Sequence, residues 1–231
     1  MSKPIQQMFT NIAHRYDLAN DVLSFGMHRL WRRQAVAFSG VAQGSSVLDL
    51  CCGTGELARC LARAVGKRGS VVGLDFVPEM IELAIEKEQR DPSSADVRFL
   101  VGDALKIPFP DESFSLCTIA FGIRNVDDVS VCLREMRRVL TPGGTAMVLE
   151  FGQPHLPGLK QVFSLFSRFV MPLIGRLVTG DNDAYHYLPK SSSTFACDEK
   201  FLALMEGSEF INCAKRSLCG GIAYLYRGSK I

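Results

Sequence analysis

A glycine-rich loop and a lone acidic residue further along the chain are the residues of this sequence best suited to binding a cofactor. Residues 47–55 read VLDLCCGTG, and Asp75 ends the next apolar run, twenty residues after Gly55. Glycines in such a turn let the backbone approach a ligand closely, and an acid that ends the second strand can accept hydrogen bonds from ribose hydroxyls. This spacing predicts a site for a cofactor that carries a nucleoside.

The elements that would position these residues alternate regularly through the middle of the chain. We expect strands at 46–50, 70–75, 97–101, 114–120 and 145–151, and helices at 55–65, 78–90 and 128–139. Parallel strands need right-handed crossovers, which are usually helical, so this alternation predicts a mostly parallel sheet with helices on both faces. The glycine loop would join the first strand to a helix that starts near Glu56.

A helical segment is expected before this core, and a tight turn within it. Residues 5–38 predict a helical N-terminal segment, with Asp17, Asn20 and Asp21 as helix caps. Thr-Pro-Gly-Gly at 141–144 predicts a turn between a helix and the next strand.

The end of the chain predicts a hairpin. We expect a helix at 198–207 and two strands at 211–217 and 221–227, which would pair as an antiparallel hairpin at the edge of the sheet. Five alternating units followed by one hairpin are the layout of class I methyltransferases.

The glycine pattern is also compatible with a dinucleotide-binding domain. Ala58 stands where the third glycine of that motif falls, and alanine is permitted there.

Composition excludes several classes. The 231 residues carry a formal charge of only +2, so no nucleic-acid-binding footprint is present. The eight cysteines include no C-x-x-C pair, and no histidine lies at zinc-finger spacing from them, so we expect no metal site. The opening MSKPIQQMFTN lacks a secretory pattern, and we expect a cytoplasmic protein.

Five segments outside the glycine loop resemble one enzyme family. They are YDLANDVLSFGMHRLWRR (16–33), VGDALKIPFPDESFSLCTIAFGIRNVDD (101–128), RVLTPGGTAMVLEF (138–151), YHYLPKSS (185–192) and GGIAYLYRG (220–228). Together they resemble the quinone-ring C-methyltransferases of menaquinone and ubiquinone biosynthesis, nearly end to end.

This resemblance implies a fold and a division of the chain. The fold is the α/β class I S-adenosylmethionine-dependent methyltransferase (Rossmann-like) fold, with a mostly parallel seven-stranded sheet and a terminal antiparallel hairpin. Residues 1–231 would form a single methyltransferase domain, in which 1–40 are a helical N-terminal segment and 152–195 are a helical insert that forms a lid over the substrate.

The resemblance also implies the residues that bind S-adenosylmethionine. Gly53, Thr54 and Gly55 would approach its amino-acid part and ribose with their backbones. Asp75 would accept hydrogen bonds from the ribose hydroxyls. Asp103, with the backbone of Ala104, would face the adenine.

The implied chemistry is transfer of a methyl group to a ring carbon of a reduced quinol. The enzyme must align carbon, methyl and sulfur, and it must favour the phenolate-like form of the quinol. Arg124 is our first candidate for the cation that stabilises the oxyanion, and the neighbouring Asn125 would hold its loop. His186 is the candidate base, although water could take that role. Tyr16 could contact the cofactor or the quinol, whereas His28 is expected to pack or to contact the lid.

The expected substrate is a polyprenyl quinol, with demethylmenaquinol first and 2-polyprenyl-6-methoxy-1,4-benzoquinol as the alternative. An NAD-dependent oxidoreductase and a non-catalytic cofactor-binding scaffold are the rival functions.

The apolar stripe of residues 159–178 predicts a helix that packs on the sheet, or an amphipathic lid that dips into a membrane surface, or both. Its three cations and Pro172 disfavour a transmembrane helix. Peripheral contact with the inner face of the membrane and a homodimer are further expectations.

Overall fold

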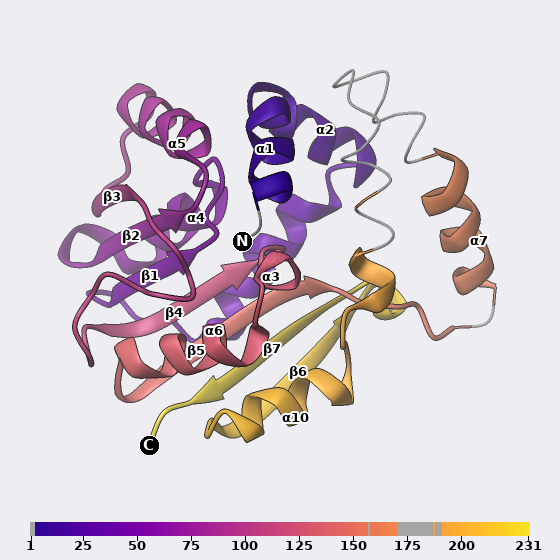
Figure 1. Ribbon diagram of the computed structural model, residues 1–231. Helices are drawn as coiled ribbons and strands as arrows, with labels where there is room; N and C mark the ends of the chain where they lie inside the picture. The colour runs from indigo at the N-terminus through magenta and orange to yellow at the C-terminus, as the bar shows by residue number, and fades with distance from the viewer. Residues whose placement is uncertain (1–2, 157, 171–186, 188–190) are drawn as a thin grey trace.

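Seven strands form one sheet at the centre of the molecule (Figure 1). The computed structural model describes residues 3–156, 158–170, 187 and 191–231. The strands are β1 (Ser46–Leu50), β2 (Ser70–Asp75), β3 (Asp96–Val101), β4 (Phe114–Ala120), β5 (Leu140–Phe151), β6 (Ile211–Leu218) and β7 (Ala223–Ser229). Their order across the sheet is β3-β2-β1-β4-β5-β7-β6.

The direction of the strands creates the place where a ligand can bind. β3, β2, β1, β4 and β5 pair in parallel, and β7 pairs antiparallel with both β5 and β6. The predicted parallel sheet with its terminal hairpin is therefore confirmed. The chain winds outward from β1 through β2 to β3 and then returns to β4 on the other side of β1. The loops that follow β1 and β4 leave in opposite directions, which opens a crevice at this switch point.

Helices cover both faces of the sheet because the strands are apolar on both sides. Leu48 and Leu50 of β1 pack on the side of α6 (Val129–Val139) and α10 (Glu199–Gly207). Val47 packs on the opposite side, with α3 (Met27–Ser39), α4 (Glu56–Val65) and α5 (Pro78–Arg90). Side chains alternate along a strand, so Asp49 projects to the same face as Val47, toward α3 and α4.

The N-terminal segment is helical, as expected, but its predicted caps are wrong. Its helices are α1 (Lys3–Ile12), a 3-10 turn (Ala13–Arg15), α2 (Tyr16–Leu23) and α3. None of Asp17, Asn20 and Asp21 caps a helix, because Arg15 occupies the N-cap position of α2 and Gly26, in the left-handed region, occupies that of α3. Asp17 and Asp21 instead bind cations and a hydroxyl of neighbouring elements.

The predicted turn at 141–144 lies within β5. Phe114 pairs with Leu140 and Leu116 pairs with Thr145, so the four residues form a bulge in the strand. Tertiary pairing is the reason: the Gly143 N–H donates to the carbonyl of Lys230, and the Lys230 N–H donates to the carbonyl of Gly144, both at 2.9 Å.

The insert after β5 begins with α7 (Leu159–Leu165), which continues as a π-helical segment (Phe166–Val170). The rest of the predicted apolar stripe, residues 171–178, lies outside the described residues. Phe163 and Phe166 pack against Ile12, Ala19 and Leu23 of the N-terminal segment. The insert and the N-terminal helices therefore meet on the side of the sheet where the crevice opens.

Candidate active site

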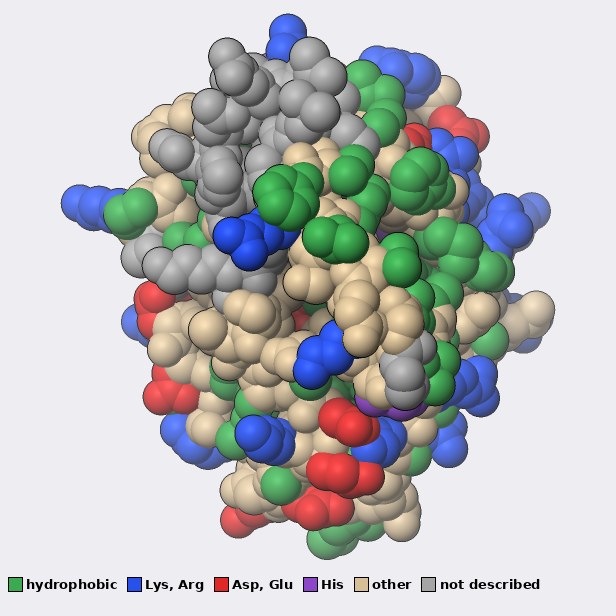
Figure 2. All heavy atoms as spheres, turned by 90° about the vertical axis from the view of Figure 1, so that its right-hand side faces the viewer, with side chains coloured by type: hydrophobic (Ala, Val, Ile, Leu, Met, Phe, Trp, Pro, Cys, Tyr) green, Lys and Arg blue, Asp and Glu red, His purple; other side chains and the backbone are tan. Residues whose placement is uncertain are grey.

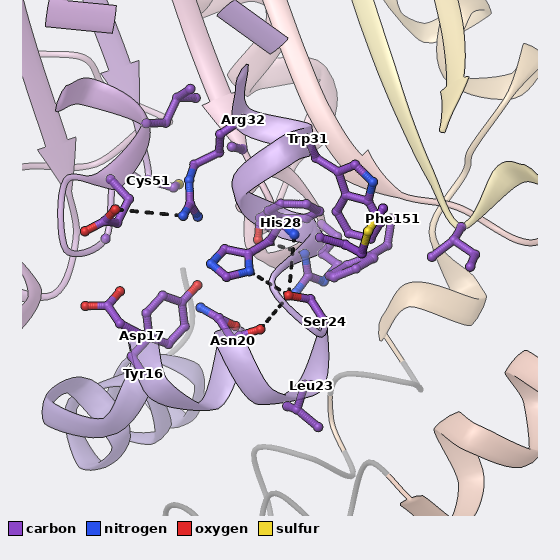
Figure 3. A pocket seen from close by; sticks show the side chains of 18 of the residues that line it. Tyr16, Asp17, Asn20, Leu23, Ser24, His28, Trp31, Arg32, Cys51 and Phe151 are labelled. Carbon is purple, nitrogen blue, oxygen red and sulfur yellow. Dashed lines mark hydrogen bonds and ion pairs between the residues drawn. The ribbon is translucent and has the colours of Figure 1, made fainter. Parts of the chain in front are cut away.

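A cavity of about 400 Å³ lies at the switch point of the sheet (Figure 3). Its walls come from the loops that follow β1 and β4, from α2 and α3 of the N-terminal segment, and from α7. The glycine loop, the N-terminal segment and the insert therefore all line this one cavity.

The glycine loop turns through left-handed backbone at both of its glycines, and it lies too close to a neighbouring ring to admit a side chain at Gly55. Gly53 and Gly55 both have positive φ, of +54° and +81°. A Cβ at Gly55 would lie 2.7 Å from Cζ of Phe99, whereas a Cβ at Gly53 would find Tyr16 no closer than 3.8 Å. Cys51, at the end of β1, also has a positive φ of +49°, which is a strained conformation for a residue with a side chain.

These two glycines make a matched pair for a stability test. Replacing either by alanine forces a side chain into the left-handed region, at a cost of about 1–2 kcal/mol. Gly55→Ala adds a steric overlap with Phe99, which costs about 1–3 kcal/mol more. We expect urea unfolding to show a clearly larger loss of stability for Gly55→Ala than for Gly53→Ala. Equal losses would contradict the packing described for this loop.

Asp75 holds the glycine loop in place. Its carboxylate is buried and accepts hydrogen bonds from the backbone N–H groups of Gly53, at 2.8 Å, and Val77, at 2.9 Å. Burial raises the pKa of Asp75, and these backbone groups oppose that shift. Each carboxylate oxygen can accept a second hydrogen bond, so ribose hydroxyls could still bind. Asp75 does not line the cavity, and its contact with ribose stays a prediction.

Asp103 and Ala104 follow β3 at the same edge of the sheet. The carboxylate of Asp103 accepts a hydrogen bond from the Leu105 N–H at 2.9 Å, and Ala104 is buried. Neither residue lines the cavity. Their assignment to adenine also stays a prediction.

Arg124 lies in the cavity wall just after β4. Its Nη1 donates to Oε1 of Glu150 at 2.6 Å and to the carbonyl of Phe121 at 2.7 Å. Its side chain is only 6% exposed and that of Glu150 is fully buried. Burial raises the pKa of Glu150, while the charge of Arg124 lowers it. The buried Nε of Arg124 has no hydrogen-bond partner, so this cation has binding capacity left for a ligand.

Asn125 secures the segment that follows Arg124 to the insert. Asn125 is buried, and its Oδ1 accepts a hydrogen bond from the Tyr187 hydroxyl at 3.0 Å. Tyr187 itself lines the cavity. The candidate base His186 lies outside the described residues, and its role stays a prediction.

An aromatic wall faces the glycine loop across the cavity. The rings of Phe121 and Phe151 lie 4.5 Å apart, and Trp31 lies 6.1 Å and 6.3 Å from them, measured between centroids. Arg124 stacks on Phe151 at 5.1 Å from the ring centroid. This arrangement suits a flat aromatic ligand that presents oxygen atoms to a cation.

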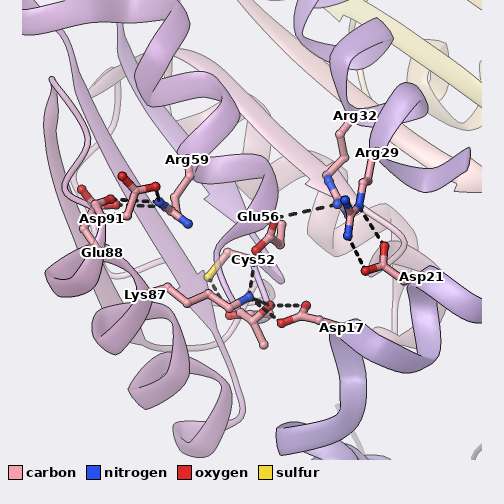
Figure 4. Close-up of polar contacts among 12 residues, drawn as sticks. Asp17, Asp21, Arg29, Arg32, Cys52, Glu56, Arg59, Lys87, Glu88 and Asp91 are labelled. Atoms are coloured by element: carbon pink, nitrogen blue, oxygen red, sulfur yellow. Dashed lines mark hydrogen bonds and ion pairs between the residues drawn. The ribbon is translucent and has the colours of Figure 1, made fainter. Parts of the chain in front are cut away.

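The N-terminal helices cover the cavity and are tied down by polar contacts (Figure 4). The Thr54 hydroxyl donates to Asp17 at 2.7 Å, and Lys87 Nζ donates to Thr54, Asp17 and Glu56. The side chain of Thr54 is therefore already bound within the protein, so only its backbone remains for a cofactor.

Tyr16 and His28 face the cavity, and both are neutral at pH 7. Burial raises the pKa of Tyr16. Burial also lowers the pKa of His28 to about 4, and its Nδ1 lies 2.6 Å from the Ser24 hydroxyl.

Sequence reasoning missed two charged residues of this cavity. Asp49 lies in the middle of β1, and Arg32 comes from α3. Asp49 stands in an apolar strand, which is the only sequence signal for a special role. Arg32 is one of several basic residues on its helix, and nothing in its spacing distinguishes it. Within the described ranges, no group of three or more His, Cys, Asp or Glu residues could hold a metal ion.

Comparison with known proteins places the chain in a family. Residues 1–230 match the model of the ubiE/COQ5 methyltransferase family. The chain belongs to this family. A demethylmenaquinone methyltransferase of Staphylococcus aureus strain MRSA252 is 41% identical over 226 residues, which are 98% of this chain and 92% of that relative. The predicted family is confirmed, and membership decides against an NAD-dependent oxidoreductase.

Solved structures with low sequence identity share the fold. A SAM-dependent methyltransferase from Thermotoga maritima has a TM-score of 0.68 at 20% identity, over 97% of this chain and 99% of that chain. A phosphoethanolamine N-methyltransferase 2 of Haemonchus contortus, in complex with S-adenosyl-L-methionine, has a TM-score of 0.62 at 15% identity, over 85% of this chain and 52% of that one. The predicted class I methyltransferase fold is confirmed, and this ubiE/COQ5 family member is an S-adenosylmethionine-dependent methyltransferase.

Proposed function

We propose that this chain transfers a methyl group from S-adenosylmethionine to a ring carbon of a polyprenyl quinol, and that this quinol is demethylmenaquinol. The family and the names of the relatives support this proposal. The observation that carries it is the cavity at the switch point, which is lined by the glycine loop and by an aromatic wall on which Arg124 stacks.

The cavity residues fit a polar ligand as well as an aromatic one. Among the described residues, four buried side-chain atoms have no hydrogen-bond partner, and three belong to residues of this cavity: Trp31 Nε1, Asp49 Oδ2 and Arg124 Nε. Buried polar atoms are nearly always hydrogen-bonded in folded proteins. Ligands that bring acceptors and donors into the cavity would supply the missing partners.

The residues divide between holding the methyl donor and activating the quinol. S-adenosylmethionine supplies a methyl group on a positively charged sulfur. The ring carbon forms its bond to this methyl as the bond to sulfur breaks, the sulfur keeps the electron pair, and one proton leaves the quinol, so charge balances. The glycine loop and Asp75 hold the donor, and Arg124 stabilises the negative charge that develops on the quinol oxygen. The aromatic wall keeps water away from the reacting carbon.

A transfer assay tests this proposal directly. The purified chain is given S-adenosylmethionine with a labelled methyl group and reduced demethylmenaquinone, and in parallel 2-polyprenyl-6-methoxy-1,4-benzoquinol. We expect label on the naphthoquinol ring, detected by mass spectrometry. Label on the benzoquinol alone would correct the substrate. Binding of S-adenosylhomocysteine without transfer to either quinol would favour the cofactor-binding scaffold.

We also propose that the insert contacts a membrane surface, where a polyprenyl substrate resides. No helix within the described ranges is long and apolar enough to cross a membrane. Phe25, Leu165 and Phe169 are each more than half exposed, and the Phe25 ring lies 6.0 Å from that of Phe166. Figure 2 shows hydrophobic side chains gathered in the upper part of this face, and a cluster of acidic ones near its lower end. Such a patch suits the interface of a lipid bilayer.

Vesicle flotation tests the membrane contact. Leu165→Ser with Phe169→Ser removes two exposed apolar side chains and should weaken binding to anionic phospholipid vesicles by at least about tenfold. Ile211→Ser changes an exposed apolar residue on β6 and serves as the matched control. Unchanged flotation of the double variant would contradict the contact. The expected homodimer stays a prediction, which sedimentation of the purified chain would test.

A further inference from the structure

A buried carboxylate, that of Glu150, lies behind the cavity wall near the end of β5. Its side chain is fully buried, and it does not line the cavity itself. Its Oε1 accepts hydrogen bonds from Nη1 of Arg124, at 2.6 Å, and from the backbone N–H of Phe151, at 2.8 Å. Its Oε2 accepts from the backbone N–H of Arg124 at 3.4 Å. This one carboxylate therefore binds both the side chain and the backbone of Arg124.

The loop after β4 completes the support of the guanidinium. The Phe121 carbonyl accepts a second hydrogen bond from Nη1 of Arg124, at 2.7 Å. Phe121 has a positive φ of +55°, which is a strained conformation for a residue with a side chain. Its N–H donates to the carbonyl of Leu149 at 2.8 Å, which holds this strained residue against β5. Nη1 is thus held from two sides, and Nε, which has no hydrogen-bond partner, is left for a ligand.

A buried ion pair of this kind contributes little to stability by itself. Taking two charges out of water costs free energy that their attraction often only offsets, and apolar residues of similar size can stabilise a protein as well or better. The surroundings of this pair point to orientation instead. The guanidinium of Arg124 lies over the ring of Phe151, 5.1 Å from its centroid, and the Phe151 N–H donates to the same carboxylate. Glu150 thus fixes the cation relative to the aromatic wall.

We infer that Glu150 is a positioning residue for methyl transfer, which holds the guanidinium of Arg124 where it meets the quinol oxygen and itself contacts neither the quinol nor the cofactor. This inference rests on the proposed function. A displacement of about 1 Å in a group that acts on the transition state can lower a rate by about 100-fold. The place of the oxygen that Arg124 binds, more than the charge on the carboxylate, therefore sets the rate.

Two substitutions at Glu150 separate its geometry from its charge. Glu150→Gln keeps an oxygen at the Oε1 position, which can still accept from Arg124 and Phe151, but it removes the charge. Glu150→Asp keeps the charge and withdraws the carboxylate by one methylene group, so Arg124 must shift to keep its partner. We expect the turnover number at saturating methyl donor to fall by no more than about fivefold for Glu150→Gln and by about 30- to 100-fold for Glu150→Asp. The affinity for S-adenosylhomocysteine should change by less than about threefold in both.

Thermal stability, measured beside turnover, distinguishes positioning from a merely structural role. Glu150→Gln leaves the buried charge of Arg124 without its counter-charge, whereas Glu150→Asp leaves only a small cavity. We therefore expect Glu150→Gln to unfold at the lower temperature of the two. If the role were structural, turnover would follow stability and Glu150→Asp would be the more active variant. Positioning gives the reverse order, at a temperature at which both variants are folded.

Matched controls come from Glu135 on α6, whose carboxylate binds Arg138 at 2.7 Å and which does not line the cavity. Glu135→Gln and Glu135→Asp should both keep the wild-type turnover number. Wild-type turnover in Glu150→Asp, or turnover in Glu150→Gln no higher than in Glu150→Asp, overturns the inference. A wild-type chain that methylates neither quinol overturns the proposed function, and the role of Glu150 falls with it.

Discussion

Arg124→Met is expected to lower the turnover number for methyl transfer by about 10²–10³ while changing the affinity for S-adenosylhomocysteine less than threefold. Arg124 is the buried cation of the aromatic part of the cavity. Removing one preorganised group that stabilises developing negative charge typically has an effect of this size. The measurement is the rate of label transfer at saturating methyl donor, together with calorimetric binding of the homocysteine product.

Arg124→Met also affects stability, because Arg124 pairs with the buried Glu150. A second substitution, at Glu150, separates this effect from the effect on catalysis. Arg124→Met leaves the carboxylate of Glu150 buried without its counter-charge, which typically destabilises a protein by about 3–5 kcal/mol. Combining it with Glu150→Gln removes that charge and should restore most of the thermal stability. If Arg124 stabilises the quinol oxygen as proposed, the double variant should still be inactive, because it lacks that cation. A stable double variant with more than about a tenth of wild-type turnover would show that Arg124 has a structural role only.

Asp75→Asn is expected to weaken binding of S-adenosylhomocysteine by about 10- to 100-fold. Both oxygens of Asp75 already accept backbone hydrogen bonds. An asparagine would turn an NH2 group toward one of these N–H donors, which leaves a buried N–H unsatisfied and loosens the glycine loop. It would also remove the charge that would strengthen the predicted hydrogen bonds from the ribose hydroxyls.

Ligand choice distinguishes the two roles of Asp75. Adenosine and 2′,3′-dideoxyadenosine differ only in the ribose hydroxyls, and the wild-type chain should prefer adenosine. Asp75→Asn should lose this preference if the carboxylate binds the hydroxyls. Asp96→Asn, on the exposed start of β3, where its carboxylate binds Arg98, is the matched control. A retained preference in a folded Asp75→Asn chain would mean that Asp75 only supports the loop.

Much of the fold could be predicted because its signals are local. The apolar runs of β1, β2 and β4 and the periodicity of α4, α5 and α6 depend on neighbouring residues, and each was predicted to within one residue of its observed bounds. The predicted turn at 141–144 and the predicted caps of the N-terminal helices were wrong for the opposite reason. There, contacts with Lys230 and with other helices replace the local preference.

The candidate site was predictable only where it follows a strand. The glycine loop follows β1, Asp75 ends β2 and Arg124 lies in the loop after β4, so their place at one edge of the sheet follows from parallel pairing. The orientation of their side chains does not follow. The structure shows that Asp75 is occupied by backbone N–H groups and that the hydroxyl of Thr54 is turned toward Asp17.

The sequence by itself determined the family, the order of the elements and the place of the glycine loop after β1, because short-range pattern and glycine spacing encode them. Only the tertiary structure decided which charges meet in the cavity. Arg124 and Glu150 are 26 residues apart in the chain, and they meet because β4 and β5 pair in one register. Arg32 and Asp49 line the same cavity because α3 folds over the face of the sheet to which β1 turns its odd-numbered side chains. Such meetings depend on packing between distant segments, which no local pattern records.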